Sequence, residues 1–127
     1  MNADLRFRLT PYLEINSSDR SFLDLLLEKL GEEALTGLWA GGNIRYVFGP
    51  IDNGEDDSAF MVGDGTNFVV HLDDRMPVGM VIDFLLHELG HLHSWDVADQ
   101  NEDHCDEFGK SFALLYRLYL TLYEETL

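Results

Sequence analysis

The spacing of hydrophobic positions changes along the chain and predicts a helix, then strands, then two further helices. From Ser18 to Leu30 the apolar residues recur every three or four positions, as on one face of an amphipathic helix. Gly31 offers a residue that can adopt the left-handed conformation with which helices commonly end. From Gly37 to Leu72 short apolar runs alternate with glycine-rich turns, a texture that indicates β-strands.

Three short runs in this second region have the alternation or composition of strands. They cover residues 44–48, Ala59 to Val62, and Asn67 to Leu72. The Asp64-Gly65 step between the last two is a strong signal for a β-hairpin. We therefore expect a small antiparallel meander. The acidic stretch 52–57 lacks the ligand order of a calcium loop and is predicted to be a solvated turn.

Two helices are predicted for the rest of the chain. Pro77 suits the first turn of a helix that runs to about Trp95 and is apolar around most of its circumference, so this helix should run through the middle of the domain. After a polar loop, apolar residues at helical spacing predict a last helix from about His104 to Glu124. The pattern indicates one α+β domain, residues 1–127, with a small antiparallel or mixed sheet packed on these helices.

Charge and cysteine content narrow the range of partners and compartments. The 24 acidic and 8 basic residues give a net charge of −16, which should repel nucleic acid and anionic membranes and could favour basic peptides or proteins. The N-terminal residues lack the apolar core of a secretory signal, and no apolar run has the length of a membrane span. The one cysteine, Cys105, has no partner for an intramolecular disulfide and is expected to be a buried, inert thiol. We expect a cytoplasmic protein.

The sequence His87-Glu88-Leu89-Gly90-His91 on the central helix is the clearest chemical signal. Two histidines four residues apart lie on one helix face, about one turn apart, and can share a zinc ion. Glu88 lies one step around the helix, where its carboxylate can take a proton from a zinc-activated water without being a ligand. This division of roles predicts zinc as cofactor and Glu88 as general base.

A catalytic zinc normally has three protein ligands and a water, so a third ligand is needed. The metzincin continuation would require glycine and histidine where the chain has Ser94 and Val97, so that pattern fails. His104 is the best remaining candidate, because it opens the last helix after a loop long enough to reverse the chain. Phe108, one turn further on, could anchor that helix in the core.

The segment from His104 to Phe108 adds a family resemblance. HExxH followed by His104-Cys105-Asp106-Glu107-Phe108 resembles the HExxH and HxxxF pairing of the SprT-like and WLM-type minimal zincin metallopeptidases. The resemblance implies a zincin-like domain in which His104 is the third ligand and Phe108 is structural. It also implies that Asn67 to Leu72 is the edge strand along which an extended peptide substrate lies.

The ImmA/IrrE-type peptidases are a second relative by resemblance, and they use an acidic third ligand. In this chain that ligand would be Asp103, Asp106 or Glu107. Because zinc accepts either a histidine or a carboxylate, both alternatives stay open at this point.

Other polar residues have weaker claims to a role. Asp83 lies one turn before His87 and could orient its imidazole. His71 could hold substrate or an oxyanion, although a solvent-facing strand residue has the same pattern. Tyr119 could donate to a tetrahedral intermediate or simply be part of the aromatic core. His93 is only two positions from His91 and should face away from it, as a rim or surface residue.

These patterns together predict a zinc-dependent hydrolase that cleaves peptide bonds in a peptide or protein substrate. Two alternatives come from other classes. The same ligands could hold zinc in a non-catalytic interaction module, in which the metal only stabilises the two C-terminal helices. An acidic decoy that binds a basic partner through its charge would need no metal.

Overall fold

Three helices and a three-stranded sheet make up the described part of the chain. The computed structural model describes residues 17–51, 59–73, 75–98 and 105–126. In chain order the elements are α2 (Ser17–Leu35), β1 (Asn43–Phe48), β2 (Ala59–Gly63), β3 (Asn67–Leu72), α3 (Val78–His93) and α4 (Asp106–Thr126). This arrangement confirms the predicted α+β class. The acidic stretch 52–57 lies outside the described residues.

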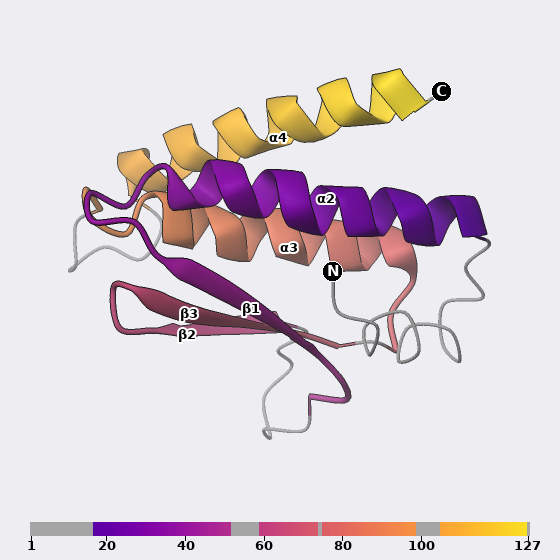
Figure 1. Ribbon diagram of the computed structural model, residues 1–127, viewed down its shortest axis with the longest axis horizontal. Coiled ribbons are helices and arrows are strands. Elements are labelled where there is room, and N and C mark those ends of the chain that lie inside the picture. The colour runs from indigo at the N-terminus through magenta and orange to yellow at the C-terminus, as the bar shows by residue number, and fades with distance from the viewer. Residues whose placement is uncertain (1–16, 52–58, 74, 99–104, 127) are drawn as a thin grey trace.

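The elements form layers, with α3 at the centre (Figure 1). The sheet lies on one side, α2 and α3 pack against each other above it, and α4 packs on these two helices. α3 contacts the sheet and both other helices, as its apolar circumference predicts. Its buried side chains are those of Val81, Ile82, Leu85, Leu86, Glu88, Leu89 and Leu92. None of the described helices is long and apolar enough to span a membrane.

The hairpin between β2 and β3 is confirmed, and its turn is held by an aspartate. The Asp64 Oδ1 atom accepts hydrogen bonds from the backbone N–H groups of Thr66 and Asn67, at 2.9 and 2.7 Å. Gly65 has φ 95°, a conformation that side chains with a Cβ rarely adopt. The Asp-Gly step therefore forms the turn that its sequence predicts.

The strand order is β1-β3-β2, so the predicted meander is wrong. β1 pairs with β3 in parallel, whereas β2 pairs with β3 in antiparallel orientation. β3 is consequently the central strand, and the prediction that Asn67–Leu72 is an edge strand is also wrong. The physical reason is the burial of its side chains. Phe68, Val70 and Leu72 are only 0 to 1% exposed, and a strand with so apolar a face is favoured in the middle of a sheet, with a strand on each side.

Helix α2 does not end at Gly31, as the sequence predicted, but continues to Leu35. Gly31 lies in the helix because it makes room for a side chain of β1. A Cβ at this position would lie 2.7 Å from the hydroxyl oxygen of Tyr46, which donates a hydrogen bond of 2.8 Å to the carbonyl of Leu27. Gly31 therefore serves the contact between α2 and the sheet.

An ion pair fixes the chain between β3 and α3. The buried carboxylate of Asp73 accepts hydrogen bonds from the backbone and the guanidinium of Arg75, the shortest at 2.7 Å, and from the backbone N–H of Ile51. These bonds, above all those from the Arg75 side chain, lower the pKa of Asp73 to about 2. Pro77 then precedes the first residue of α3, as predicted for a proline at a helix start.

Candidate metal centre

The two histidines of the HExxH motif direct the same ring atom at each other. The Nε2 atoms of His87 and His91 lie 3.2 Å apart, and both side chains are half-buried. Their rings are 4.8 Å apart between centroids and nearly perpendicular, at 77°. α3 produces this arrangement because residues four apart in a helix lie on one face, one turn from each other.

This separation fits two nitrogens of one zinc site. Two nitrogens that are each about 2.05 Å from a tetrahedral zinc lie about 3.3 Å from each other. The observed 3.2 Å agrees with that value. Without a metal the same separation would be a hydrogen bond, with one ring donating Nε2–H and the other accepting, so that the two rings would have opposite tautomers.

Glu88 lies between the two histidines in the sequence and is buried, with 9% of its surface exposed. It belongs to a helix whose other buried residues are apolar or glycine. Ionisable side chains are rarely buried to this degree unless a specific partner compensates for the loss of hydration. Its position is therefore consistent with a defined chemical role beside the histidine pair.

Helix α4 covers the histidine pair with one aromatic ring. The centroid of the Phe108 ring lies 4.3 Å from that of His91, with the rings nearly parallel at 30°, and 5.2 Å from that of His87. The approach depends on Gly90, since a Cβ there would lie 3.0 Å from the Phe108 ring. The spacing predicted that Phe108 anchors the last helix in the core, but the ring is half-buried and packs on the two imidazoles instead.

Two features of the contact between α3 and α4 were not predicted from the sequence. The first is the role of Gly90, which has no local signature because the Phe108 ring that requires a glycine there belongs to α4. The second feature is a hydrogen bond of 2.7 Å between His93 Nδ1 and the hydroxyl of Ser111, which is buried on α4. His93 is half-buried and joins the two helices.

The predicted third ligand, His104, lies outside the described residues, as does its alternative Asp103. Among the residues that the structure does describe, no group of three histidine, cysteine or acidic side chains is placed to hold a metal. Asp106 is exposed, and Glu107 lies 4.0 Å from Lys110 in an ion pair along α4. The structure therefore does not bring Asp106 or Glu107 into a ligand group with the histidine pair. Cys105 is buried at 7% exposure, as expected.

Tyr119 lies near Asp83 and away from the histidine pair. Tyr119 is separated from Phe108 by about 16 Å along the axis of α4, too far to donate to a group held at the histidines. Burial raises the pKa of Tyr119, and the nearby charge of Asp83 adds to this shift. Asp83 itself is exposed, one turn before His87.

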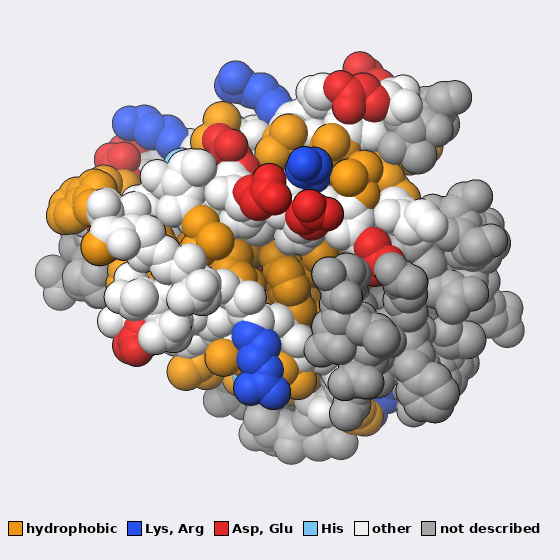
Figure 2. Space-filling model, in the orientation of Figure 1, with side chains coloured by type: hydrophobic (Ala, Val, Ile, Leu, Met, Phe, Trp, Pro, Cys, Tyr) orange, Lys and Arg blue, Asp and Glu red, His pale blue; other side chains and the backbone are white. Residues whose placement is uncertain are grey.

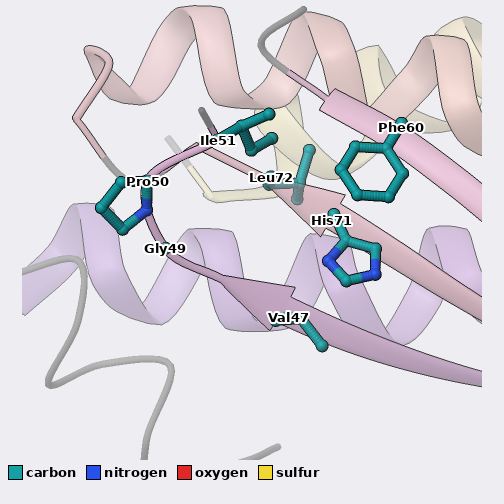
Figure 3. A pocket seen from close by; sticks show the side chains of 7 residues that line it. All are labelled: Val47, Gly49, Pro50, Ile51, Phe60, His71 and Leu72. Atoms are coloured by element: carbon teal, nitrogen blue, oxygen red, sulfur yellow. The ribbon is translucent and has the colours of Figure 1, made fainter. Parts of the chain in front are cut away.

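His71 lies on the other side of the sheet (Figure 3). On β3 it alternates with Val70 and Leu72, which face the helices, so its ring points away from α3. It stacks on Phe60 of β2, with centroids 4.2 Å apart, in a cavity of about 240 Å³ that Val47 and Pro50 also line. Burial, with a smaller effect of Arg45, lowers the pKa of His71. The structure thus does not bring His71 together with the candidate metal centre.

Comparisons of the chain with protein-family models, with curated proteins and with solved structures gave no match. The chain's own residues are consequently what indicates its function. Those residues are a histidine pair whose 3.2 Å separation fits a zinc site or a hydrogen bond, a buried glutamate next to it in the sequence, and a helix with one aromatic ring against the pair.

Proposed function

We propose that the chain is a zinc-dependent hydrolase of the zincin-like type that cleaves peptide bonds. His87 and His91 hold the metal through Nε2, and His104 provides the third ligand. The observation that carries the proposal is the 3.2 Å separation of the two Nε2 atoms, beside the buried side chain of Glu88. The packing of Phe108, four residues after His104, against both imidazoles supports the choice of His104.

Glu88 is the general base in this proposal. When bound, zinc supplies Lewis-acid chemistry that lowers the pKa of a water and polarises the substrate carbonyl. The Glu88 carboxylate accepts the proton that the attacking water loses and then donates it to the nitrogen of the leaving amine. Because Glu88 is offset from His87 by about 100° around the helix, it can do this without taking a ligand position.

The backbone of the substrate requires an open strand edge, and β3 does not provide one. Both of its edges are paired, with β1 and β2. Of the two outer strands in the described sheet, β2 is the one that packs against α3. We therefore assign the pairing of an extended peptide to β2 rather than to Asn67–Leu72.

The test is a comparison of Glu88→Gln with the wild type in the hydrolysis of fluorescein-labelled casein. The variant should keep its zinc and its circular dichroism spectrum but lose at least about 100-fold in rate, the usual contribution of a general base. Glu124→Gln, the same chemical change at an exposed position of α4, is the matched control and should hydrolyse casein normally. Full activity in Glu88→Gln would show that the mechanism is wrong.

One observation favours a second candidate, a non-catalytic zinc module. Phe108 and Gly90 hold α4 against the histidine pair, so a metal there could serve mainly to join α3 and α4. The casein assay separates the two candidates. Zinc-loaded wild type that hydrolyses no peptide bond, and loses helix packing on chelation, would favour the structural module.

A further inference from the structure

A continuous row of aromatic rings leads away from the histidine pair along α4. We call Phe108, Phe112, Tyr116, Tyr119 and Tyr123 the aromatic row. Neighbouring ring centroids in the row are 5.9 to 6.3 Å apart, within the range of favourable aromatic contacts. The row begins at the candidate metal centre, because Phe108 contacts both imidazoles.

Exposure varies along the row, and Tyr119 is half-buried between two exposed tyrosines. Phe108 and Phe112 are half-buried, whereas 42% of Tyr116 and 46% of Tyr123 are exposed. Phe22 of α2 supports the far end, at 6.2 Å from Tyr119 and 5.9 Å from Tyr123 between centroids. Hydrophobic side chains are visible at the surface where α2 and α4 run, with carboxylates nearby (Figure 2). Exposed aromatic surface that continues from a candidate catalytic site is typical of a binding surface.

Asp83 gives this surface a negative charge. It is exposed on α3, on the same helix face as His87. α3 and α4 run in opposite directions from the contact between His91 and Phe108, so Asp83, eight residues before His91, lies at the level of Tyr116, eight residues after Phe108. The charge of Asp83 also acts on Tyr119. A carboxylate beside the faces of aromatic rings is a favourable environment for an ammonium or guanidinium group. Arg117, the exposed basic residue in this part of α4, is offset from Tyr119 by about 200° around the helix and so points elsewhere.

The distance along α3 between Asp83 and the histidine pair tells how far from the cleaved bond a bound side chain would be. Asp83 lies about 9 Å along the helix axis from the point midway between His87 and His91. An extended polypeptide advances about 3.3 Å per residue. A substrate side chain that points away from β2 and toward α4 would therefore lie level with Asp83 when it is about three residues from a bond held at the histidine pair.

We infer that Asp83, Tyr116 and Tyr119 bind a lysine or arginine side chain of the polypeptide substrate, about three residues from the bond to be cleaved. The inference rests on the proposed function, because it names the substrate class of the same site. The net charge of −16 favours the same class, since it attracts basic polypeptides.

The experiment measures binding, without turnover, to the Glu88→Gln protein. The probes are fluorescein-labelled octapeptides that are identical except at one central position, which carries lysine, arginine, norleucine or glutamate. Fluorescence anisotropy should give Kd values about five- to tenfold lower for lysine and arginine than for norleucine, and the highest Kd for glutamate. Adding Asp83→Asn, or separately Tyr119→Leu, should reduce the lysine preference to less than about twofold.

The matched control is Glu125→Gln, which removes the same charge from an exposed position two residues beyond Tyr123 and so on a different side of α4. It should leave the preference intact. A lysine preference that survives Asp83→Asn overturns the inference, and so does an equal loss of affinity for all four peptides, which would indicate that Asp83 only orients His87. Failure of the proposed function is a separate result, because it is read from zinc content and casein hydrolysis.

Discussion

The ring of Phe108 stacks on the imidazole of His91, with centroids 4.3 Å apart and 30° between the ring planes. This contact connects the histidine pair of the candidate metal centre, His87 and His91, with α4. In the sequence, α4 follows the predicted third ligand, His104. Gly90 permits it, because a larger residue would meet the Phe108 ring at van der Waals distance or closer. The packing of two helices and the geometry of the histidine pair are therefore coupled.

Gly90→Ala should displace the Phe108 ring by a few tenths of an ångström and loosen the packing of α4 on α3, although alanine is the better helix former. Overpacking of this kind costs about 1 to 3 kcal/mol, which equals or exceeds the gain of about 1 kcal/mol in helix propensity. Gly109→Ala is the matched control, since a Cβ there meets nothing within 4 Å. Urea unfolding should show a stabilised Gly109→Ala and a destabilised Gly90→Ala with weaker zinc binding. Equal stabilisation by both substitutions would contradict the coupling.

The contact between Gly31 and Tyr46 predicts a non-additive pair of substitutions. Gly31→Ala places a Cβ 2.7 Å from the Tyr46 hydroxyl and should destabilise the protein. Tyr46→Phe removes the hydrogen bond to Leu27, worth about 1 kcal/mol, but also removes the clashing oxygen. The double variant should therefore be more stable than the sum of the single effects predicts. A double-mutant cycle measured by urea unfolding tests this, and simple additivity would count against the contact.

Asp73 predicts a specific dependence of stability on pH. Because the folded state lowers its pKa to about 2, the ionised form stabilises the fold, and this contribution is complete above the unfolded pKa of about 3.9. It is lost as the pH falls from about 4 toward 2. Asp73→Asn should cost about 2 kcal/mol at pH 6, and the difference from wild type should shrink below pH 4. A difference that stays constant down to pH 2.5 would refute this role.

Removal of zinc should lower the stability of the whole domain. A ligand that binds only the folded protein adds about 2.7 kcal/mol when its free concentration is 100 times its Kd. Thermal unfolding with and without a chelator measures this contribution. The Tm should fall on chelation in the wild type and change little in His87→Ala. A Tm that is insensitive to chelator in the wild type would argue against a metal held in the folded state.

The sequence predicted elements with local signals well and long-range pairing poorly. The β2–β3 turn followed from Asp64-Gly65, and the start of α3 followed from Pro77. The central place of β3 did not follow, because parallel pairing with β1 joins strands that are 24 residues apart and has no local signature. Gly31 was misread for the same reason, since the side chain that requires a glycine there belongs to β1.

The candidate site shows the same difference between features with a local sequence signal and features set by long-range packing. The shared helix face of His87 and His91 followed from their spacing, and their 3.2 Å separation agrees with it. The prediction that His71 could hold substrate depended on its place in Asn67 to Leu72, the predicted edge strand. Its orientation depends on which face of the sheet the helices cover, and that face is set by Phe68, Val70 and Leu72.

The most direct test of the account is the zinc content of protein purified without a metal-affinity tag. Elemental analysis should give one zinc per chain in the wild type and in His71→Ala, whose imidazole lies on the far side of the sheet. His87→Ala and His104→Ala should lose most of it. Wild-type protein without zinc, even after incubation with the metal, or a His104→Ala variant with full zinc content, would contradict the three-histidine site.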